Sequence, residues 1–553
     1  MKQLVDAQSR TKERQALCWL AGAILVWAFI SSHATMSVDP PSRYLEAKAL
    51  VETGSFAVTP LTGEGIPPGV FSGKDGQLYS YFGKVQSVFF AGPYWFCTRV
   101  LDIQSDKLIR SLTALTLFPL LLTMLGLAFY FLLKEFDFSP RASLTGALLV
   151  VFATGIWQTS KEAQEEPILA LFYVLAVYGL RRYQKSASLF SLLTACLAIA
   201  AAILTRTDTL PTIFCFLLIT SWLILRQQKA GPKIALHRLA ALLIVMGCLG
   251  YATALQIGIN LLLFGHPISA IDDQLSWFSW SILPMGLKGL LISPGRGLIW
   301  FNPFVLLTIL GLPWLWKHHR SFFFLITGSF LGCLLLHAAY PVFHGNCCWG
   351  PRYLIRHMPL LLLVACLFGL TAGSNSVLRR YLFATVMIIS VLVQLLAVSM
   401  HHTREILELD AAYPGSWSDR QFTMYEPQAH VIPRRIENLT QALHDMTTGN
   451  IPPWPTGDTT ALTEQEKLDA PVLRYLAFWP CHLTYYLPAV RPGLAAPLWL
   501  SSSILLGGIL LGTFCCRRAY RLCPATYRRF GPEPGQTATS SMPRSAVTAP
   551  ALH

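Results

Sequence analysis

Long apolar runs without charge determine the fold class of this chain. Between Arg14 and Asp39 there is no Asp, Glu, Lys or Arg, and comparable runs recur along the sequence. A helix needs about 20 apolar residues to cross the hydrocarbon core of a bilayer. Only 13% of the 553 residues are charged, whereas soluble domains carry about a quarter. We therefore predict an all-α polytopic membrane protein.

Hydropathy predicts about twelve transmembrane helices, and the segments between them define the expected domains. The helices are expected at residues 16–33, 110–133, 143–161, 166–182, 187–205, 209–225, 238–263, 298–316, 321–340, 353–373, 380–400 and 494–516. The aromatic stretch 85–102 is apolar but short, so we expect an interfacial helix there. The expected division is a cytoplasmic tail (1–16), a transmembrane catalytic region (17–400) with a large first outer loop (34–109), an outer, periplasmic segment of mixed structure (401–493), a last helix (494–516) and a basic, partly disordered cytoplasmic tail (517–553).

The net charge of +14 reflects short basic clusters that lie between the apolar runs. With a cytoplasmic N-terminus, every cluster falls on the same side, which is the positive-inside pattern. This distribution disfavours nucleic-acid binding and predicts a multi-pass inner-membrane protein with both termini in the cytoplasm. The first apolar run also resembles a secretory signal peptide, but we favour a retained helix. The clusters are Arg10/Lys12/Arg14, Arg181/Arg182/Lys185, Arg226/Lys229/Lys233, Lys317/Arg320, Arg379/Arg380 and Arg517/Arg518/Arg521.

The first outer loop begins with a carboxylate close to the membrane surface. Asp39 follows the first helix by a few residues, and two prolines fix the backbone before a helix expected from about Ser42. A carboxylate held there can act as a general base on an acceptor that arrives from outside. The alternative is that Asp39 or Ser42 caps the following helix.

This loop resembles the first outer loop of the GT-C glycosyltransferases, membrane enzymes that use polyprenyl-phosphate sugars. The lipid A aminoarabinose transferase and the protein O-mannosyltransferases are in this class, in which an Asp after the first helix precedes an Arg-Tyr pair. Here these residues are Asp39 and Arg43-Tyr44, with one more residue between Asp and Arg than in the aminoarabinose enzyme. The resemblance implies that Asp39 is catalytic and that Arg43 and Tyr44 bind substrate.

The resemblance continues in the segment from Tyr81 to Lys84. Lys84 matches a Lys of the aminoarabinose transferase, which implies a contact to the donor phosphate, and we include Tyr81 among the substrate-binding residues. Gly83 replaces a Glu of that enzyme, which puts in doubt any metal site that used it. The metal ligands are therefore unknown, and a divalent metal is a possible cofactor. Alternatively, Lys84 is an interfacial anchor that snorkels.

An acid-proline pair opens the fourth predicted helix, as it does in the GT-C class. Glu166 is the acid here, with Glu in place of the family's Asp. We predict that Glu166 is a second catalytic residue, acting as a partner of the acceptor or of Asp39. The alternative is that its charge simply complements the helix dipole.

Two Arg residues occupy Gly/Pro-rich turns on the predicted outer side, each just before a helix. Arg296 and Arg352 can clamp a phosphate there, and Tyr353 follows Arg352 directly. We predict substrate binding for all three. The alternative for the two Arg residues is a lipid-headgroup anchor or a turn-stabilising salt bridge. Arg206 is a weaker candidate because it can pair locally with Asp208.

These residues together predict an inverting glycosyltransferase, either hexosyl or pentosyl, with one Asp base. It would move a sugar from a polyprenyl-phosphate donor to a glycan, lipid or protein acceptor at the outer face of the membrane. The alternatives are a lipid or solute transporter, including a flippase, and a surface-polysaccharide polymerase or ligase. A disulfide from Cys347 or Cys348 to Cys481 is an open alternative for an oxidising compartment.

Overall fold

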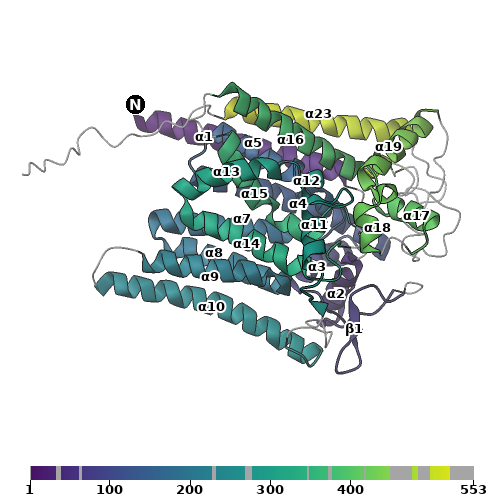
Figure 1. The fold of residues 1–553 in the computed structure, drawn as a ribbon, viewed down its shortest axis with the longest axis horizontal. Coiled ribbons are helices and arrows are strands. Elements are labelled where there is room, and N and C mark those ends of the chain that lie inside the picture. Colours follow the sequence, from purple (N-terminus) through teal and green to yellow (C-terminus); the bar gives the residue numbers. More distant parts are fainter. Residues whose placement is uncertain are drawn as a thin grey trace, which may run out of the picture.

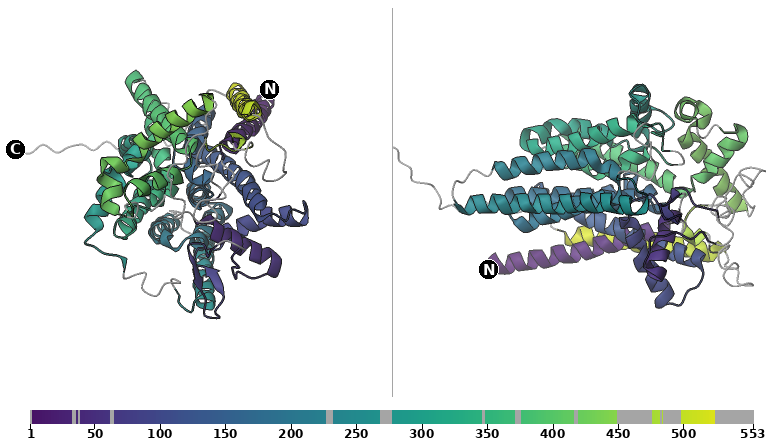
Figure 2. Two further views of the ribbon diagram at one scale, coloured as in Figure 1. Left: turned by 90° about the vertical axis from the view of Figure 1, so that its right-hand side faces the viewer. Right: turned by 90° about the horizontal axis from the view of Figure 1, so that it is seen from below.

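The computed structural model describes residues 2–32, 36, 39–61, 65–226, 232–267, 277–345, 348–370, 376–415, 419–448, 476–481, 483 and 498–523. Most of them form helices that run side by side in one bundle (Figures 1 and 2). The bundle helices are α1 (Lys2–Ser31), α4 (Asp106–Glu135), α5 (Pro140–Phe152), α6 (Ile156–Lys161), α7 (Glu166–Ser186), α8 (Leu189–Thr205), α9 (Leu210–Leu225), α10 (Pro232–Leu263), α13 (Val305–His318), α14 (Arg320–Ala338), α15 (Met358–Gly369), α16 (Val377–Ser399) and α23 (Leu498–Leu522). The remaining elements are α2 (Pro40–Thr53), β1 (Val70–Ser72), β2 (Leu78–Ser80), α3 (Val85–Arg99), η1 (Thr207–Thr209), α11 (Leu283–Ile292), α12 (Leu298–Phe301), η3 (Arg352–His357), α17 (Thr403–Ala412), α18 (Arg420–Tyr425), η5 (Pro427–Ala429) and α19 (Val431–Thr448).

Eight helices within the described residues are long and apolar enough to cross a membrane. The structure is nearly all-α, as predicted, with the β1–β2 hairpin as the exception among the described residues, whereas the count of about twelve spans is not confirmed. All twelve expected segments contain helix, but four of them are short, interrupted or charged. These are 143–161, broken between α5 and α6; 166–182, where α7 ends in basic turns; 187–205, where α8 has 17 residues; and 298–316, broken between α12 and α13.

The two interrupted helices contact each other at their breaks. The backbone N–H of Gly155, between α5 and α6, donates to Oδ1 of Asn302, between α12 and α13, at 2.9 Å. A Cβ atom on Gly155 would lie 2.5 Å from the Ile355 side chain, so a larger residue would force that side chain to move. Non-helical backbone at membrane depth is tolerated where protein buries it, and Gly155 and Asn302 are both buried. Hydropathy did not predict these breaks because they depend on a tertiary contact.

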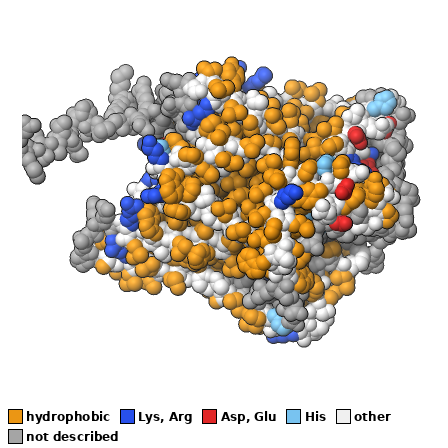
Figure 3. All heavy atoms as spheres, in the orientation of Figure 1, with side chains coloured by type: hydrophobic (Ala, Val, Ile, Leu, Met, Phe, Trp, Pro, Cys, Tyr) orange, Lys and Arg blue, Asp and Glu red, His pale blue; other side chains and the backbone are white. Residues whose placement is uncertain are grey.

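The basic connections gather at one end of the bundle, which we call the basic end. Figure 3 shows Lys and Arg side chains at the end where α1 begins. Lys134, at the end of α4, pairs there with Glu13 of α1 at 2.9 Å. Nε of Arg141, at the start of α5, donates to the Cys523 carbonyl just after α23 at 3.0 Å. The beginning of α1 and the end of α23 therefore lie at the same end of the bundle, as the predicted alternation of connections requires.

The opposite end, which we call the site end, carries the first loop and the late segment (Figures 1 and 2). The first loop contains α2, α3 and an antiparallel hairpin of β1 and β2. On α3, the side chains of Val88, Trp95 and Phe96 are about half exposed, while Phe90 and Tyr94 are buried. An apolar helix with one exposed face supports the predicted interfacial helix at this end of the bundle.

The described part of the late segment consists of helices and turns, where mixed structure was expected. Arg435 of α19 attaches this segment to the bundle. Its guanidinium donates to three carbonyl oxygens at the C-terminal end of α16, at 2.9–3.2 Å, and to a carboxylate oxygen of Glu405 in α17 at 2.8 Å. A cation at a helix C-terminus satisfies carbonyls that have no partner within the helix.

Candidate active site

Eight charged side chains form one cluster at the site end, and we call it the charge cluster. Each Arg in it contacts at least one carboxylate, so four positive charges face four negative ones. Burying charge is costly unless it is paired, and this balance allows the cluster to sit between helices. Its members are Asp39 and Arg43 from the start of α2, Glu165 and Glu166 from the start of α7, Arg206 and Asp208 between α8 and α9, and Arg352 and Arg356 from η3.

Asp39 occupies the N-cap position of α2, but its side chain makes no capping hydrogen bond. Instead its Oδ2 lies 2.6 Å from Nη1 of Arg352. The capping alternative for Asp39 is therefore wrong, and Ser42 lies inside α2. Burial opposes ionisation of Asp39, but Arg352 and Arg43 outweigh it and lower the pKa of this carboxyl below its ordinary value. The carboxylate is negatively charged at neutral pH, as a general base must be.

Glu165 and Glu166 link the Arg residues of the cluster. The Glu165 carboxylate contacts Arg43 and also lies 2.5 Å from Nη1 of Arg206. Oε1 of Glu166 accepts from Nε of Arg352 at 2.9 Å and lies 3.6 Å from Arg206. The predicted partnership of Glu166 with Asp39 therefore runs through Arg352, which both carboxylates share.

Asp208 extends the cluster towards α14. It pairs with Arg206 at 2.8 Å and with Arg356 at 2.6 Å, and it lies 3.0 Å from Nε2 of His337. The predicted local pair of Arg206 and Asp208 is thus present, but it is part of a larger network. Because Arg206 also contacts both glutamates, it lies at the centre of the cluster.

Exposure divides the charge cluster into two groups. Four side chains keep 12–20% of their surface exposed, and these are Asp39, Arg206, Asp208 and Arg352. The other four, Arg43, Glu165, Glu166 and Arg356, are 1% exposed. Solvent therefore reaches the first group far more than the second. Glu166, predicted as a partner of the acceptor, is in the buried group.

A cavity of about 140 Å³ adjoins the cluster at Arg206 and Asp208. Arg206, Asp208 and His337 line one part of it, and Tyr81 and Tyr353 contribute aromatic rings. The Tyr353 ring stacks on His337 with 4.5 Å between ring centroids. The structure therefore brings Tyr81 and Tyr353, both predicted to bind substrate, to the same cavity as Arg206.

Lys84 and Tyr44 are engaged elsewhere. Nζ of Lys84 contacts the buried Glu46 carboxylate and donates to the Ser80 carbonyl at 2.7 Å. A donor phosphate would have to displace Glu46 to reach Lys84, and Lys84 does not snorkel because it is buried. Tyr44 is fully buried and donates its hydroxyl to Asp106 Oδ1 at 2.8 Å. Lys84 and Tyr44 thus have other partners and do not line the cavity, and their predicted substrate contacts stay predictions.

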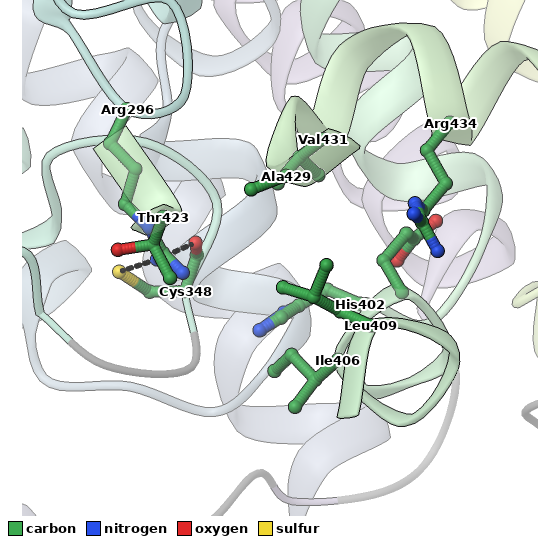
Figure 4. Close-up of a pocket in the computed structure, with 10 residues that line it drawn as sticks. Arg296, Cys348, His402, Ile406, Leu409, Thr423, Ala429, Val431 and Arg434 are labelled. Atoms are coloured by element: carbon green, nitrogen blue, oxygen red, sulfur yellow. Dashed lines mark hydrogen bonds between the residues drawn. The ribbon is translucent and has the colours of Figure 1, made fainter. Parts of the chain in front are cut away.

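Arg296 lies in a different place, beside the late segment (Figure 4). Its Nη1 donates to the Cys348 carbonyl at 2.6 Å, and the preceding N–H of Gly295 donates to the Met424 carbonyl of α18 at 3.1 Å. The cavity next to Arg296 measures about 20 Å³ and is also lined by His402. This volume holds roughly one or two water molecules, so a sugar phosphate does not fit. The turn-stabilising alternative describes Arg296 better than donor binding.

Gly83 is required by a close backbone approach. A Cβ atom at this position would lie 2.2 Å from the Thr205 carbonyl oxygen and 2.4 Å from that of Leu204. A larger residue at position 83 would force the backbone of one of these segments to shift. Among the described residues, no three His, Cys, Asp or Glu side chains converge as a metal site.

The cysteine alternatives are partly resolved. Cys348 and Cys481 are both free thiols, so the bridge between them does not form. Cys347 lies outside the described residues, and its pairing stays an open alternative.

Several members of the site were not predicted from the sequence. Glu165 is next to Glu166, and hydropathy cannot tell which of the two faces an Arg. Arg356 follows Arg352 by four residues, and this spacing puts both on one side of a helical turn. The sequence therefore contains a signal that could identify Arg356. His337 had a signal of its own, because an ionisable residue in an apolar helix is a functional candidate.

The comparison with known families applies to the middle of the chain. Residues 92–263 match the family model described as dolichyl-phosphate-mannose-protein mannosyltransferase. This match confirms the resemblance to the GT-C membrane glycosyltransferases. The matched region contains Glu165, Glu166, Arg206 and Asp208, whereas Asp39 and the η3 arginines lie outside it. No curated protein matches the chain. The mannosyltransferase similarity and the apolar helices together indicate a membrane glycosyltransferase.

Proposed function

We propose that the protein transfers a sugar from a polyprenyl-phosphate donor to an acceptor hydroxyl at the site end of the bundle. The observation that carries this proposal is the position of Asp39. It is the most exposed carboxylate beside Arg352, it is ionised, and it belongs to a cluster with two further exposed groups, Arg206 and Asp208. The similarity to dolichyl-phosphate-mannose-protein mannosyltransferases supports a polyprenyl-phosphate-linked sugar as the donor.

In the proposed reaction, Asp39 accepts the proton of the acceptor hydroxyl. The acceptor oxygen bonds to the anomeric carbon while the bond from that carbon to the phosphate oxygen breaks, and the bond electrons leave with polyprenyl phosphate. Displacement by one nucleophile without a covalent intermediate inverts the anomeric centre, and the carbon passes through an oxocarbenium-like state.

Negative charge develops on the departing phosphate, and preorganised cations can stabilise it. Arg206 and Arg352 are the two exposed arginines of the cluster, so we assign this role to them. Their carboxylate partners Glu165 and Glu166 are buried and keep both guanidinium groups oriented. This assignment replaces Lys84 and Arg296, whose cationic groups have other partners.

We also propose that the site end faces the periplasm or cell exterior. The support is the gathering of basic connections at the other end (Figure 3), which the positive-inside rule places in the cytoplasm. The acceptor, a glycan, lipid or protein, would then arrive from outside.

The test is mass spectrometry of lipid-linked sugars and surface glycans in cells with the wild-type protein, without it, and with Asp39→Asn. Loss of the protein should cause one polyprenyl-phosphate sugar to accumulate, and Asp39→Asn should reproduce that accumulation at normal protein levels. General-base catalysis contributes roughly 10²–10⁴-fold, so residual transfer should be barely detectable.

Asp106→Asn is the matched control. Asp106 is also at the site end, is paired with Lys48 at 2.8 Å and is 23% exposed, close to the 20% of Asp39, but it is not in the charge cluster. It should leave the lipid-linked sugars unchanged. Full activity of Asp39→Asn would contradict the role of Asp39 as base.

A further inference from the structure

Helix α10 combines a lipid-facing surface with two buried amides. Its segment Ile234–Leu263 is apolar enough to span a membrane, and Tyr251 and Leu262 are about 70% exposed. Gln256 and Asn260, one turn apart, are only 7% and 6% exposed. Polar groups inside an apolar helix are costly and mark functional sites more often than chance.

The two amides are joined to each other, and one acceptor atom of Gln256 has no donor. Nε2 of Gln256 donates to Oδ1 of Asn260 at 3.1 Å, and Nδ2 of Asn260 lies 3.3 Å from the Pro267 carbonyl. Within the described residues, Oε1 of Gln256 accepts no hydrogen bond although it is buried. A buried acceptor without a donor costs about 1–3 kcal/mol, and a ligand hydroxyl can remove that cost.

Both amides line the 140 Å³ cavity beside the charge cluster. By volume the cavity holds roughly ten water molecules, which is the size class of one monosaccharide ring. Five aromatic rings also line it, those of Tyr81, Phe82, Phe278, Tyr340 and Tyr353, and Arg206, Asp208 and His337 line the side next to the cluster. Aromatic faces with a few oriented polar groups are the usual composition of a specific small-ligand site.

We propose that this cavity holds the sugar of the donor and that the Gln256–Asn260 pair recognises its hydroxyl groups. The inference rests on the proposed function and adds the sugar subsite to it. Oε1 of Gln256 would accept from a sugar hydroxyl, the aromatic rings would cover the C–H faces, and Arg206 would meet the phosphate.

The composition of the cavity argues against other occupants. An isoprenoid chain would leave Oε1 of Gln256 without a donor and would remove water from the charged Arg206 and Asp208 side chains, both of which cost free energy. A phosphate placed beside the amides would face the Asp208 carboxylate and the Gln256 acceptor, both of which repel it. A neutral ring with several hydroxyls satisfies all these groups.

The experiment measures how purified protein in detergent discriminates glycosylated donors from the bare carrier. Polyprenyl-phosphate-linked mannose, glucose, galactose and aminoarabinose, and bare polyprenyl phosphate, would each compete with a fluorescent polyprenyl phosphate. Wild-type protein should prefer one glycosylated donor over the bare carrier. Gln256→Met should reduce that preference roughly 5- to 10-fold, as expected for one lost hydrogen bond, and should not change the affinity for the bare carrier.

Gln394→Met is the matched control, since Gln394 is a buried amide on α16 that donates to the Phe301 carbonyl at 2.6 Å, away from the cavity. It should leave the preference intact. Asn260→Leu provides a second test of the pair if Gln256→Met folds poorly, as judged by thermal unfolding. An unchanged preference in the Gln256 or Asn260 variant overturns the sugar subsite alone. If wild-type protein binds no glycosylated donor more tightly than the bare carrier, both this inference and the proposed donor class are overturned.

Discussion

Ion pairs at the two ends of the bundle differ mainly in exposure. At the basic end, Lys185 pairs with Asp137 at 3.2 Å, with 35% of the Lys and 64% of the Asp side chain exposed. At the site end, Glu165 pairs with Arg43 and Arg206, and the side chains of Glu165 and Arg43 are 1% exposed. Both ends are rich in Arg, but water and salt screen the charges only at the first.

This difference indicates what each end does. Exposed pairs contribute about 0–1 kcal/mol to stability. Individual ion pairs at the basic end can therefore change at little cost, provided that this end keeps the positive charge that orients the protein in the membrane. Buried pairs cost desolvation free energy that their attraction barely repays. A chain that keeps four arginines and four carboxylates together at one end uses them for something other than stability, and we attribute the buried members to orientation of Asp39, Arg206 and Arg352.

The largest effect on stability should come from removing one buried charge of the cluster. In Glu165→Gln, Arg43 and Arg206 lose their shared carboxylate, and Arg43 remains buried without an ionised partner. Breaking one partner of a buried pair costs on the order of 3–5 kcal/mol. We expect the free energy of unfolding, measured in detergent micelles, to fall by about this amount.

Glu13→Gln is the control for this comparison because it makes the same chemical change at the basic end. Glu13 pairs with Lys134, and the two side chains are 26% and 17% exposed. The expected loss is about 1 kcal/mol or less. Equal losses in the two variants would remove the distinction between the ends.

A second prediction concerns the pH dependence of transfer. Arg352 is the nearest cation that lowers the pKa of Asp39, while burial raises it. In Arg352→Gln burial remains and that cation is lost, so the pKa of Asp39 should rise. Because the base must be deprotonated, transfer activity should be lost at a higher pH in the variant than in the wild-type enzyme as the pH is lowered, which pH–rate profiles of the two proteins would measure.

Arg356→Gln separates this effect from general damage to the cluster. Arg356 is as buried as Glu165 but pairs with Asp208 and makes no contact with Asp39 among the described residues. Its loss should lower the rate of transfer at every pH without changing the pH at which activity falls on the acidic side of the pH–rate profile. If the pH of this activity loss rose equally in both variants, the assignment of Asp39 as the titrating base would fail.

The helices could be predicted from hydropathy and charge because lipid imposes a simple rule on length and composition. All twelve expected segments contain helix, and the described ends lie where the charge alternation put them. The breaks at Gly155 and Asn302 could not be predicted, since each depends on the other across the bundle.

The site was predictable only where one residue was distinctive in its own segment. Asp39, Arg43, Glu166 and Arg352 stood out in that way, and the structure brings them into one cluster. Lys84 and Arg296 looked similar, but their partners are Glu46 and the Cys348 carbonyl, distant in sequence. The amides of α10 resemble any polar residue in an apolar run until the fold turns them towards the cavity.

The smallest expected effect is that of removing an exposed ion pair at the basic end, and it tests whether this end contributes to stability or transfer at all. Lys185→Gln removes a cation that pairs with Asp137 at 3.2 Å and Glu135 at 3.5 Å, all partly exposed. The free energy of unfolding should change by less than about 1 kcal/mol, and raising the salt concentration should make even this difference disappear because exposed pairs are screened.

Transfer activity of Lys185→Gln should equal that of wild type, since the site lies at the other end of α7. A loss of transfer in Lys185→Gln without a loss of stability would mean that the basic end contributes to the reaction, and the division of roles between the ends would then be wrong.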